Sequence, residues 1–305
     1  MLYPLVLKPV FKEYLWGGTN LKKIYGADST DTIAESWVLS CHPEGVTTIV
    51  NGRFAGERLD AYIRGQDNGV LGKHAEMPLL IKLIDAADNL SIQVHPDDCY
   101  AAEREKQPGK KELWYIVDCE PDSSLFYGFN KKVLKKEFIK RAKDGSVLEV
   151  LNQVPVRQGD VFFIESGVVH AIGKGMTIAE IGSNCNITYR IFDFFRKDKT
   201  GKPRPLHLEK AAEVAVLDMS ERHTFDENGF LNCVDFAVQE IKLNGSLRLT
   251  AGCGSFHSLL GISGSCRLEF DGMHVDIEKG TSLLIPAGMG EYSMQGNAVL
   301  LKTTV

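Results

Sequence analysis

Polar side chains at alternate positions of a predicted strand are the first chemical signal in this sequence. They are Gln93 and His95, and because side chains two apart on a strand point to the same face, an amide oxygen and an imidazole would share that face. Glu112 directly precedes the apolar run 113–117 and can enter the same interior from the next predicted strand. His170 would complete a set of two imidazoles, one carboxylate and one amide oxygen, which can hold a divalent metal ion.

This donor set is a borderline nitrogen and oxygen site. It suits Zn²⁺, and Mn²⁺, Co²⁺ or Fe²⁺ could also occupy it. Zinc would have room there for water or a substrate oxygen, as catalytic zinc sites require. Each residue alone has an ordinary explanation, since a histidine before Pro96 can end a strand and a glutamate is usually exposed. The metal prediction therefore depends on the combination.

The sequence frame around His170 occurs twice. The run from Gly159 to His170 and the run from Gly280 to Glu291 both fit G-x5-[EP]-x-G-x2-[HE], which indicates duplication of one β unit. The frame resembles the second sequence motif of the cupin family, whose fold is a jelly-roll barrel and whose last position is a metal-binding histidine. Because the second copy has Glu291 and no upstream His-x-His, we expect it to lack the metal.

Most of the chain consists of short apolar or alternating runs between turn residues, which is typical of β-structure. The clearest predicted strands are at 36–39, 79–84, 113–117, 161–164 and 283–285, and residues 1–9 read as the first strand. Helical spacing occurs at 97–106, 131–143 and 206–217, and more weakly at 57–63 and 147–151. The basic, turn-rich stretch 196–205 predicts a solvated loop.

These patterns predict a mainly β protein of two cupin-type jelly-roll domains with a few short helices and a helical insert near 131–152. From about residue 228 the pattern becomes almost purely β. We therefore expect a metal-binding catalytic cupin domain over 1–225, which contains the insert, and a degenerate cupin domain without a metal site over 226–305. A chain of 305 residues suits two domains of ordinary size.

Composition excludes several classes of function. A net charge of −5 and the lack of a basic stripe with interleaved aromatics disfavour nucleic acid. No apolar run reaches the roughly 18 residues that cross a bilayer, and no signal peptide is recognisable, so we expect no membrane partner. The seven cysteines are widely spaced without a CxxC pair, which favours reduced thiols in a cytoplasmic protein. No phosphate loop or GxGxxG motif indicates nucleotide chemistry.

Several segments, taken in order, resemble the short bacterial form of type I mannose-6-phosphate isomerase. They include the uncommon Gln-x-His and span about two thirds of the chain, at 16–18, 34–37, 80–85, 90–98, 110–115, 167–171, 180–181, 188–190, 202–204 and 206–208. The C-terminal third is similar to the family only as a degenerate cupin.

The resemblance implies a site and a cofactor. It makes one Zn²⁺ per chain the cofactor, with the ligands Gln93, His95, Glu112 and His170. It matches other positions to polar residues of the family's pocket, namely Lys82, Ser91 and Lys110, and to its acidic and basic active-site residues, Glu180 and Arg190. One position departs from the pattern, because Asn186 stands where the short bacterial forms commonly have aspartate. An amide cannot act as a base, so no proton abstraction can be assigned to that position.

The implied reaction interconverts mannose 6-phosphate and fructose 6-phosphate through a cis-enediol(ate). Zinc would stabilise the developing oxyanion, and Arg190 could add charge-assisted hydrogen bonds. Lys82 and Ser91 are the candidates for holding the phosphate. For the base, Lys110 with a pKa lowered by burial and zinc, Glu180, and a zinc-bound hydroxide all remain open.

Two other functions fit the same residues. A different cupin enzyme, such as an Fe²⁺ oxygenase, could use a similar ligand set. A non-catalytic metal-containing cupin that binds a sugar phosphate would keep the basic pocket and need no base. In either of the sugar-phosphate interpretations we expect a small-molecule ligand and a monomer or weak homodimer.

Overall fold

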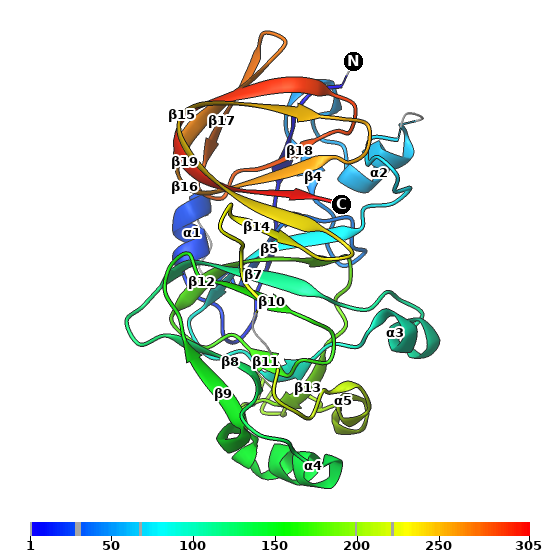
Figure 1. Ribbon diagram of the computed structural model, residues 1–305, viewed down its shortest axis with the longest axis vertical. Coiled ribbons are helices and arrows are strands. Elements are labelled where there is room, and N and C mark those ends of the chain that lie inside the picture. Colours follow the sequence, from blue (N-terminus) through cyan, green and yellow to red (C-terminus); the bar gives the residue numbers. More distant parts are fainter. Residues whose placement is uncertain (1, 28–31, 67–68, 199, 221–222) are drawn as a thin grey trace.

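The computed structural model describes residues 2–27, 32–66, 69–198, 200–220 and 223–305 (Figure 1). The predicted fold class is confirmed, because strands dominate and form three sheets with a few short helices. No helix in those ranges is long and apolar enough to cross a membrane.

Two sheets form the first barrel, in the lower half of Figure 1. The six-stranded sheet has the order β10 (Val161–Ile164), β7 (Glu112–Cys119), β12 (Met176–Ser183), β5 (Leu79–Ala86), β3 (Glu35–Leu39), β2 (Val10–Lys12). The five-stranded sheet has the order β13 (Tyr189–Phe192), β6 (Ile92–Val94), β11 (His170–Ala171), β8 (Ser124–Phe129), β9 (Leu151–Pro155). Side chains from both sheets share one core, which includes Trp114 and Ile178 from the first and Leu125 and Tyr127 from the second.

The third sheet curls around a core of its own in the upper half of Figure 1. Its order is β14 (Phe230–Asn232), β15 (Ala237–Ala251), β19 (Gly290–Thr304), β16 (His257–Phe270), β18 (Ser282–Ile285), β1 (Leu5–Lys8), β4 (Thr48–Ile49), and β17 (Met273–Glu278) pairs with β16. The strands β1 and β4 precede the expected boundary near residue 225 yet pair in this C-terminal sheet. The division at 225 therefore stays a proposal, with the N-terminal strand contributed to the second barrel.

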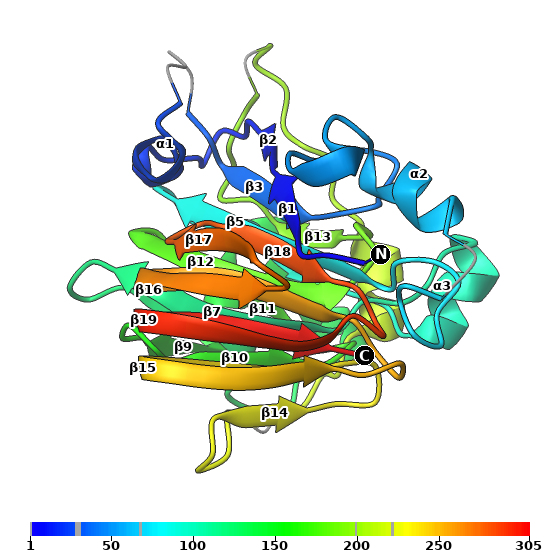
Figure 2. The ribbon, with the colours of Figure 1, turned by 90° about the horizontal axis from the view of Figure 1, so that it is seen from above.

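The six-stranded sheet lies between the two barrels, and its strands are buried on both faces. On β5, Leu79, Ile81 and Leu83 pack in the core shared with the C-terminal sheet, whereas Ile84 packs in the first barrel. Figure 2 looks down on the long C-terminal strands, which lie in front of this sheet. A strand covered on both faces reads as a continuous apolar run, and this explains why alternation is weak in LLIKLIDA. Lys82 breaks the run on the face that points into the first barrel.

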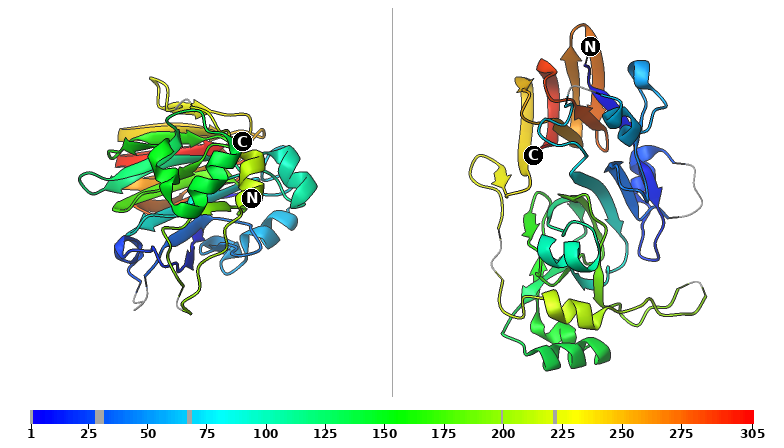
Figure 3. Two further views of the ribbon diagram at one scale, coloured as in Figure 1. Left: turned by 90° about the horizontal axis from the view of Figure 1, so that it is seen from below. Right: turned by 90° about the vertical axis from the view of Figure 1, so that its right-hand side faces the viewer.

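The helices lie outside the barrels. They are α1 (Asn20–Tyr25), α2 (Leu59–Arg64), α3 (Asp98–Arg104), α4 (Lys135–Asp144) and α5 (Leu208–Val214), with 3-10 turns η1 (Gly52–Phe54) and η2 (Ser146–Val150). Figure 3 shows α4 and α5 at the end of the molecule opposite the C-terminal barrel. In α4 the buried residues are Phe138 and Ala142, at the spacing of one helix face, and Gly145 ends the helix at a φ of 84°.

Most of the predicted elements are confirmed, including the five clearest strands and the helices near 97–106, 131–143 and 206–217. The helix α1 was not anticipated. The prediction of a solvated loop at 196–205 is wrong for two of its arginines. The side chains of Arg196 and Arg204 are only 16% and 25% exposed, because both bind the buried carboxylate of Asp193.

Candidate active site and metal centre

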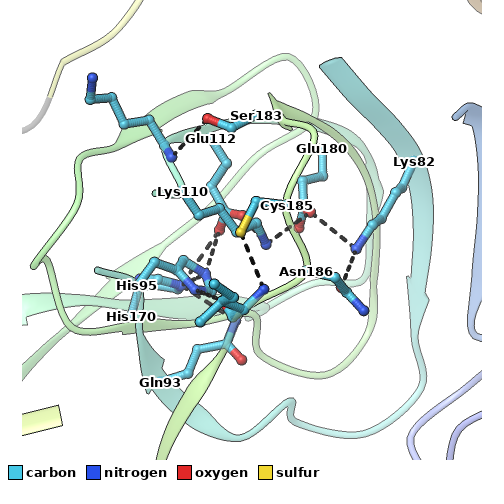
Figure 4. Close-up of polar contacts among 12 residues, drawn as sticks. Lys82, Gln93, His95, Lys110, Glu112, His170, Glu180, Ser183, Cys185 and Asn186 are labelled. Carbon is cyan, nitrogen blue, oxygen red and sulfur yellow. Dashed lines mark hydrogen bonds and ion pairs between the residues drawn. The ribbon is translucent and has the colours of Figure 1, made fainter. Parts of the chain in front are cut away.

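Three donor atoms from the two sheets of the first barrel converge inside it. Gln93 lies on β6, His95 follows that strand, and His170 begins β11 and pairs with Gln93 across the five-stranded sheet. Glu112 begins β7 in the opposite sheet and points toward them (Figure 4). His95 Nε2 lies 3.2 Å from His170 Nε2, and Glu112 Oε1 lies 3.6 and 3.4 Å from those two nitrogens. The two histidines and the glutamate are all buried.

Backbone carbonyls fix the orientation of both imidazoles. His95 Nδ1 lies 2.8 Å from the carbonyl oxygen of Ile187, and His170 Nδ1 lies 2.8 Å from that of Val168. A carbonyl only accepts, so each Nδ1 carries the proton and each Nε2 presents a lone pair to the shared point. Burial, followed by the charge of Lys110, lowers the pKa of His95. Burial, followed by His95, lowers that of His170 to about 3, so both rings are neutral.

The carboxylate of Glu112 is buried, with Oε2 in an ion pair with Lys110 Nζ, whereas Oε1 faces the two imidazoles without a hydrogen bond of good geometry among the described residues. Burial opposes its ionisation, but the charge of Lys110 and the adjacent histidines hold its pKa well below the usual range. Two neutral imidazole lone pairs and one ionised carboxylate, all buried and facing each other, leave a cation as the missing partner. The residues present therefore fit a divalent metal ion, as the sequence predicted.

Gln93 borders the same point. Its amide nitrogen lies 3.3 Å from His170 Nε2, and the two ends of an amide are alike in size, so its oxygen can take that place as a ligand. The indole of Trp114 packs edge-on against His170 at 5.2 Å between ring centres and closes the apolar side of the site. A dry apolar wall of this kind strengthens electrostatic interactions within the site.

The metal point, which is the position faced by His95 Nε2, His170 Nε2 and Glu112 Oε1, lies at one end of a cavity. A row of alternating charges leads from it into that cavity. Lys110 Nζ lies 2.6 Å from Glu112 Oε2 and 3.3 Å from Glu180 Oε1. Lys82 Nζ lies 3.4 Å from the same oxygen of Glu180 and 3.5 Å from Glu35 Oε2. Lys82, Glu112 and Glu180 come from β5, β7 and β12, three neighbouring strands of the six-stranded sheet, and face the interior of the first barrel with Ile84, Trp114 and Ile178 of its core.

The cavity measures about 250 Å³ and brings together every candidate for substrate binding and catalysis. Its walls include Lys82, Ser91, Lys110, Glu180 and Arg190, with Gln93 at the side of the metal point. Such a volume suits a small polar molecule. The sequence-predicted residues are therefore in one place, although their individual roles remain predictions.

Arg190 has a donor left for a ligand. It pairs with Gln93 between β13 and β6, and its Nη1 donates to the carbonyl of Pro205 over 2.9 Å. Its Nε is buried and has no hydrogen-bond partner among the described residues. Burial, followed by the charge of Arg204, lowers the pKa of the Arg190 guanidinium. A half-buried guanidinium with a free Nε–H is a suitable donor to an anionic oxygen.

The environment of Lys110 is the reverse of what a lysine base needs. Burial disfavours its charged form, but Glu112 and Glu180 on either side of the ammonium outweigh that and raise its pKa. The sequence-based hypothesis of a Lys110 base required a lowered pKa, and two flanking carboxylates produce the opposite shift. Lys110 is therefore better placed to hold a proton than to remove one.

Sequence reasoning gave no role to seven residues of the cavity wall, which are Tyr14, Trp16, Glu35, Ile84, Leu90, Thr188 and Arg204. Tyr14 and Trp16 stack at 5.3 Å between ring centres along one side, and Arg204 reaches the cavity from the basic loop. Arg204 is held there by Asp193, to which its Nε donates over 2.8 Å. Trp16 and Arg204 both lie in segments that carry the family resemblance, which was the available signal. Tyr14 had no signal beyond its proximity to Trp16.

The position that departs from the family pattern also faces the cavity. Asn186 Oδ1 accepts a hydrogen bond from Lys82 Nζ over 3.4 Å, and Asn186 Nδ2 donates to Glu44 Oε2 over 3.0 Å. The amide therefore lies between a cation and an anion.

Comparison with known proteins agrees with this geometry. A family model described as the catalytic domain of type I phosphomannose isomerase matches residues 5–121, and one described as the cupin domain of mannose-6-phosphate isomerase matches residues 226–305. The mannose-6-phosphate isomerase ManA of Bacillus subtilis is 37% identical over 311 residues, which cover 97% of this chain and 96% of that protein.

Solved structures give the same result. The crystal structure of the mannose 6-phosphate isomerase from Bacillus subtilis superposes with a TM-score of 0.90 at 32% identity and covers 99% of both chains. A structure described as mannose 6-phosphate isomerase bound with zinc and yttrium has a TM-score of 0.79 over 98% of both chains, and its 17% identity shows the fold alone. The resemblance found in the sequence is confirmed, and the chain belongs to the type I mannose-6-phosphate isomerase family.

Proposed function

We propose that this protein interconverts mannose 6-phosphate and fructose 6-phosphate with one zinc ion held by Gln93, His95, Glu112 and His170. The observation that carries the proposal is the buried carboxylate of Glu112, whose Oε2 is paired with Lys110 while its Oε1 faces two neutral imidazoles at the end of a cavity lined with cations. The full-length similarity to mannose-6-phosphate isomerases supports the choice of substrate.

Zinc suits the donor set because it accepts imidazole nitrogen and carboxylate oxygen together. A bound zinc ion would supply Lewis acidity that stabilises negative charge on the sugar oxygens. The structural relative described as bound with zinc supports this choice of metal. The carbonyls of Ile187 and Val168 hold the two imidazoles in the tautomer that a metal requires.

Isomerisation moves a proton between C2 and C1 of the sugar through a cis-enediol(ate), and one group must carry it. We assign this role to Glu180, whose Oε1 lies between the ammonium groups of Lys110 and Lys82 in the cavity wall. A carboxylate in this place can accept a proton directly from carbon. Lys110, whose pKa is raised, stays protonated and donates to a developing negative oxygen.

The phosphate needs cations and hydroxyl groups at the other end of the substrate. Ser91 supplies a buried hydroxyl, and Arg190 supplies an Nε left unpartnered by the described residues. Lys82 adds positive charge to the same wall, but its ammonium also faces Glu180, Glu35 and Asn186. Because these three partners hold the ammonium in place, Lys82 would contribute a fixed positive charge to phosphate binding.

The test is a coupled assay of the purified protein with mannose 6-phosphate that follows fructose 6-phosphate formation. Turnover that chelation abolishes and zinc restores would support the reaction and the metal together. Absence of turnover with zinc, Mn²⁺, Co²⁺ or Fe²⁺ would contradict isomerase activity. Binding of the sugar phosphate without turnover would then favour the non-catalytic cupin, and oxygen uptake with Fe²⁺ would favour an oxygenase.

A further inference from the structure

Asn186 lies in a short segment that contacts both a metal-facing histidine, His95, and a lysine of the cavity wall, Lys82. Residues 184–188 connect β12 to β13, and the carbonyl of Ile187 in this segment holds His95 Nδ1 at 2.8 Å. The neighbouring Asn186 accepts from Lys82 Nζ. Figure 4 shows Asn186 next to Lys82, and both residues line the cavity together with Glu180. Any displacement of the segment would therefore move Lys82 and the metal-facing histidine together.

The partners of Asn186 determine the orientation of its amide. Lys82 can only donate and the ionised Glu44 can only accept, so Oδ1 must face the ammonium and Nδ2 the carboxylate. The ammonium of Lys82 already faces the carboxylates of Glu35 and Glu180. A neutral amide completes its three acceptors without a third negative charge, and it also provides a donor for Glu44.

Glu44 lies on a loop that is itself firmly placed. The loop connects β3 to β4, and Thr47 closes it with hydrogen bonds from its N–H and its hydroxyl to the carbonyl of Ser40. Lys12 Nζ donates to the carbonyl of Glu44 over 2.5 Å. Gly45 lies so close to Trp37 that a Cβ at that position would be 3.2 Å from the ring. The carboxylate of Glu44 therefore meets Asn186 from a fixed support.

We propose that Asn186 is a positioning residue whose neutral amide joins Glu44 to Lys82 and so anchors the segment 184–188 beside the cavity. In this chain the amide is required because Glu44 supplies the negative charge at that point. The inference rests on the proposed function, because its effect is read through the substrate site. It adds Glu44, which lies outside the cavity wall, to the residues that set the geometry of the site.

The test is a double-mutant cycle between the two positions. Asn186→Asp places a second carboxylate against Glu44, so we expect kcat/KM for mannose 6-phosphate to fall by about tenfold or more, mainly through a rise in KM. Glu44→Gln alone should cost less than about threefold, because its amide oxygen still accepts from Asn186. In the double variant, the amide introduced at position 44 donates to the carboxylate introduced at position 186, and kcat/KM should return to within about threefold of the wild type.

Two results would overturn the proposal. One is an Asn186→Asp variant as active as the wild type, and the other is a loss that Glu44→Gln does not relieve. Thermal unfolding and zinc content, measured on every variant, separate positioning from damage to the fold. If Asn186→Asp does not fold, Glu44→Ala serves instead, because it removes the acceptor on the exposed loop; unchanged KM in that variant would contradict the proposal.

Failure of the proposed function can be told apart from failure of this inference. If the wild type does not isomerise mannose 6-phosphate, the same four proteins are titrated with glucitol 6-phosphate, an alditol phosphate that has no carbonyl to react. Weaker binding by Asn186→Asp that Glu44→Gln restores would support the positioning role. Equal binding by all four proteins would overturn it.

Discussion

Both barrels contain the repeated glycine frame, at 159–170 in the first and 280–291 in the second, but only the first frame ends in a residue of the proposed metal site. In the first copy of the repeated frame Gly159 and Gly167 both have a φ of 87°, and in the second copy Gly280 and Gly288 have φ values of 87° and 76°. The left-handed conformation at matching positions supports duplication of one β unit. The frames end differently, because His170 is fully buried at the metal point whereas the side chain of Glu291 is 65% exposed, 4.0 Å from Arg248.

The interiors differ in the same way. The first barrel buries Lys82, Lys110, Glu112 and Glu180 beside its apolar core. The second barrel is filled by apolar side chains such as Leu268, Met294 and Leu300, and it also buries His257. Burying ionised groups is costly unless they are paired, so their concentration in one barrel indicates chemistry there rather than stability. The repeated backbone frame thus fixes the position of its last residue. The identity of that residue, His170 or Glu291, determines whether a metal site can form there.

The strongest test of this comparison removes the last residue of each frame. His170→Ala should lower kcat/KM by about 10³-fold or more, because it removes a proposed ligand of a metal whose Lewis acidity stabilises transition-state charge by several kcal/mol. The matched change Glu291→Ala should leave kcat/KM within about twofold, since that side chain is exposed. Zinc content by atomic absorption and a coupled assay measure both effects.

A control addresses general damage in these variants. Far-UV circular dichroism and the unfolding temperature should show that His170→Ala is folded when activity is lost. Loss of zinc from the Glu291→Ala protein would contradict the division between a metal-binding and a metal-free barrel.

The next test separates the proposed base, Glu180, from the proposed hydrogen-bond donor, Lys110. Glu180→Gln keeps the shape and removes the base, so turnover should fall by about 10² to 10⁴-fold. Lys110→Met should also reduce turnover, through loss of a donor, yet it should leave proton exchange at C2 detectable in deuterated water. Near-normal turnover of Glu180→Gln would exclude Glu180 as the base. Met294→Leu, a volume-conserving change in the second barrel, is the matched control and should leave turnover unaffected.

Local sequence patterns predicted the strands and the candidate metal donors because the spacing of side chains along a strand is regular. The donors sit on or beside strands, where a two-residue spacing fixes the face, and Gln93 and His95 illustrate this directly. The ionic contacts could not be predicted in this way, because Lys110 and Glu180 are brought together by pairing of β7 and β12. The raised pKa of Lys110 follows from that pairing and from Glu112.

Long-range packing also explains two features that local patterns did not predict. The loop at 196–205 has the composition of a solvated segment, but the carbonyl of Asn89 and the buried carboxylate of Asp193 draw Arg196 inward, and Asp193 also binds Arg204. Likewise, the first strand β1 pairs with β18, almost the whole chain away, and no local pattern indicates such a partner. In both cases the deciding contacts include residues far apart in the sequence, Arg196 with Asn89 and β1 with β18.

A stability test examines the apolar barrel on its own. Leu268 is fully buried in the core of the second barrel. Leu268→Ala should reduce the free energy of unfolding by about 2–5 kcal/mol, because it removes buried methyl groups and leaves a cavity. Urea unfolding measures the loss, and kcat/KM of the folded variant should stay within about threefold. A large fall in kcat/KM at full folding would show that the second barrel shapes the site directly.

The smallest expected effect concerns the buried histidine of the second barrel. Burial, followed by the charge of Lys302, lowers the pKa of His257 from 6.5 to about 4, and its Nδ1 lies 2.9 Å from the hydroxyl of Tyr292. Between these two pH values His257 is mostly protonated in the unfolded chain and mostly neutral in the folded chain. The stability that this histidine contributes is therefore complete above pH 6.5 and falls as the pH drops toward 4.

The measurement compares urea unfolding at pH 7 and pH 5. In the wild type His257 should account for a loss of about 1–2 kcal/mol between those values, and His257→Gln should show a pH dependence smaller by that amount. The matched control is His274→Gln, an exposed histidine on β17 of the same barrel, which should keep the wild-type dependence. Because the carboxylates of the first barrel titrate alike in all three proteins, the difference between variants isolates the second barrel. An unchanged pH dependence in His257→Gln would mean that this histidine is protonated inside the fold, and the second barrel would then hold a buried charge like the first.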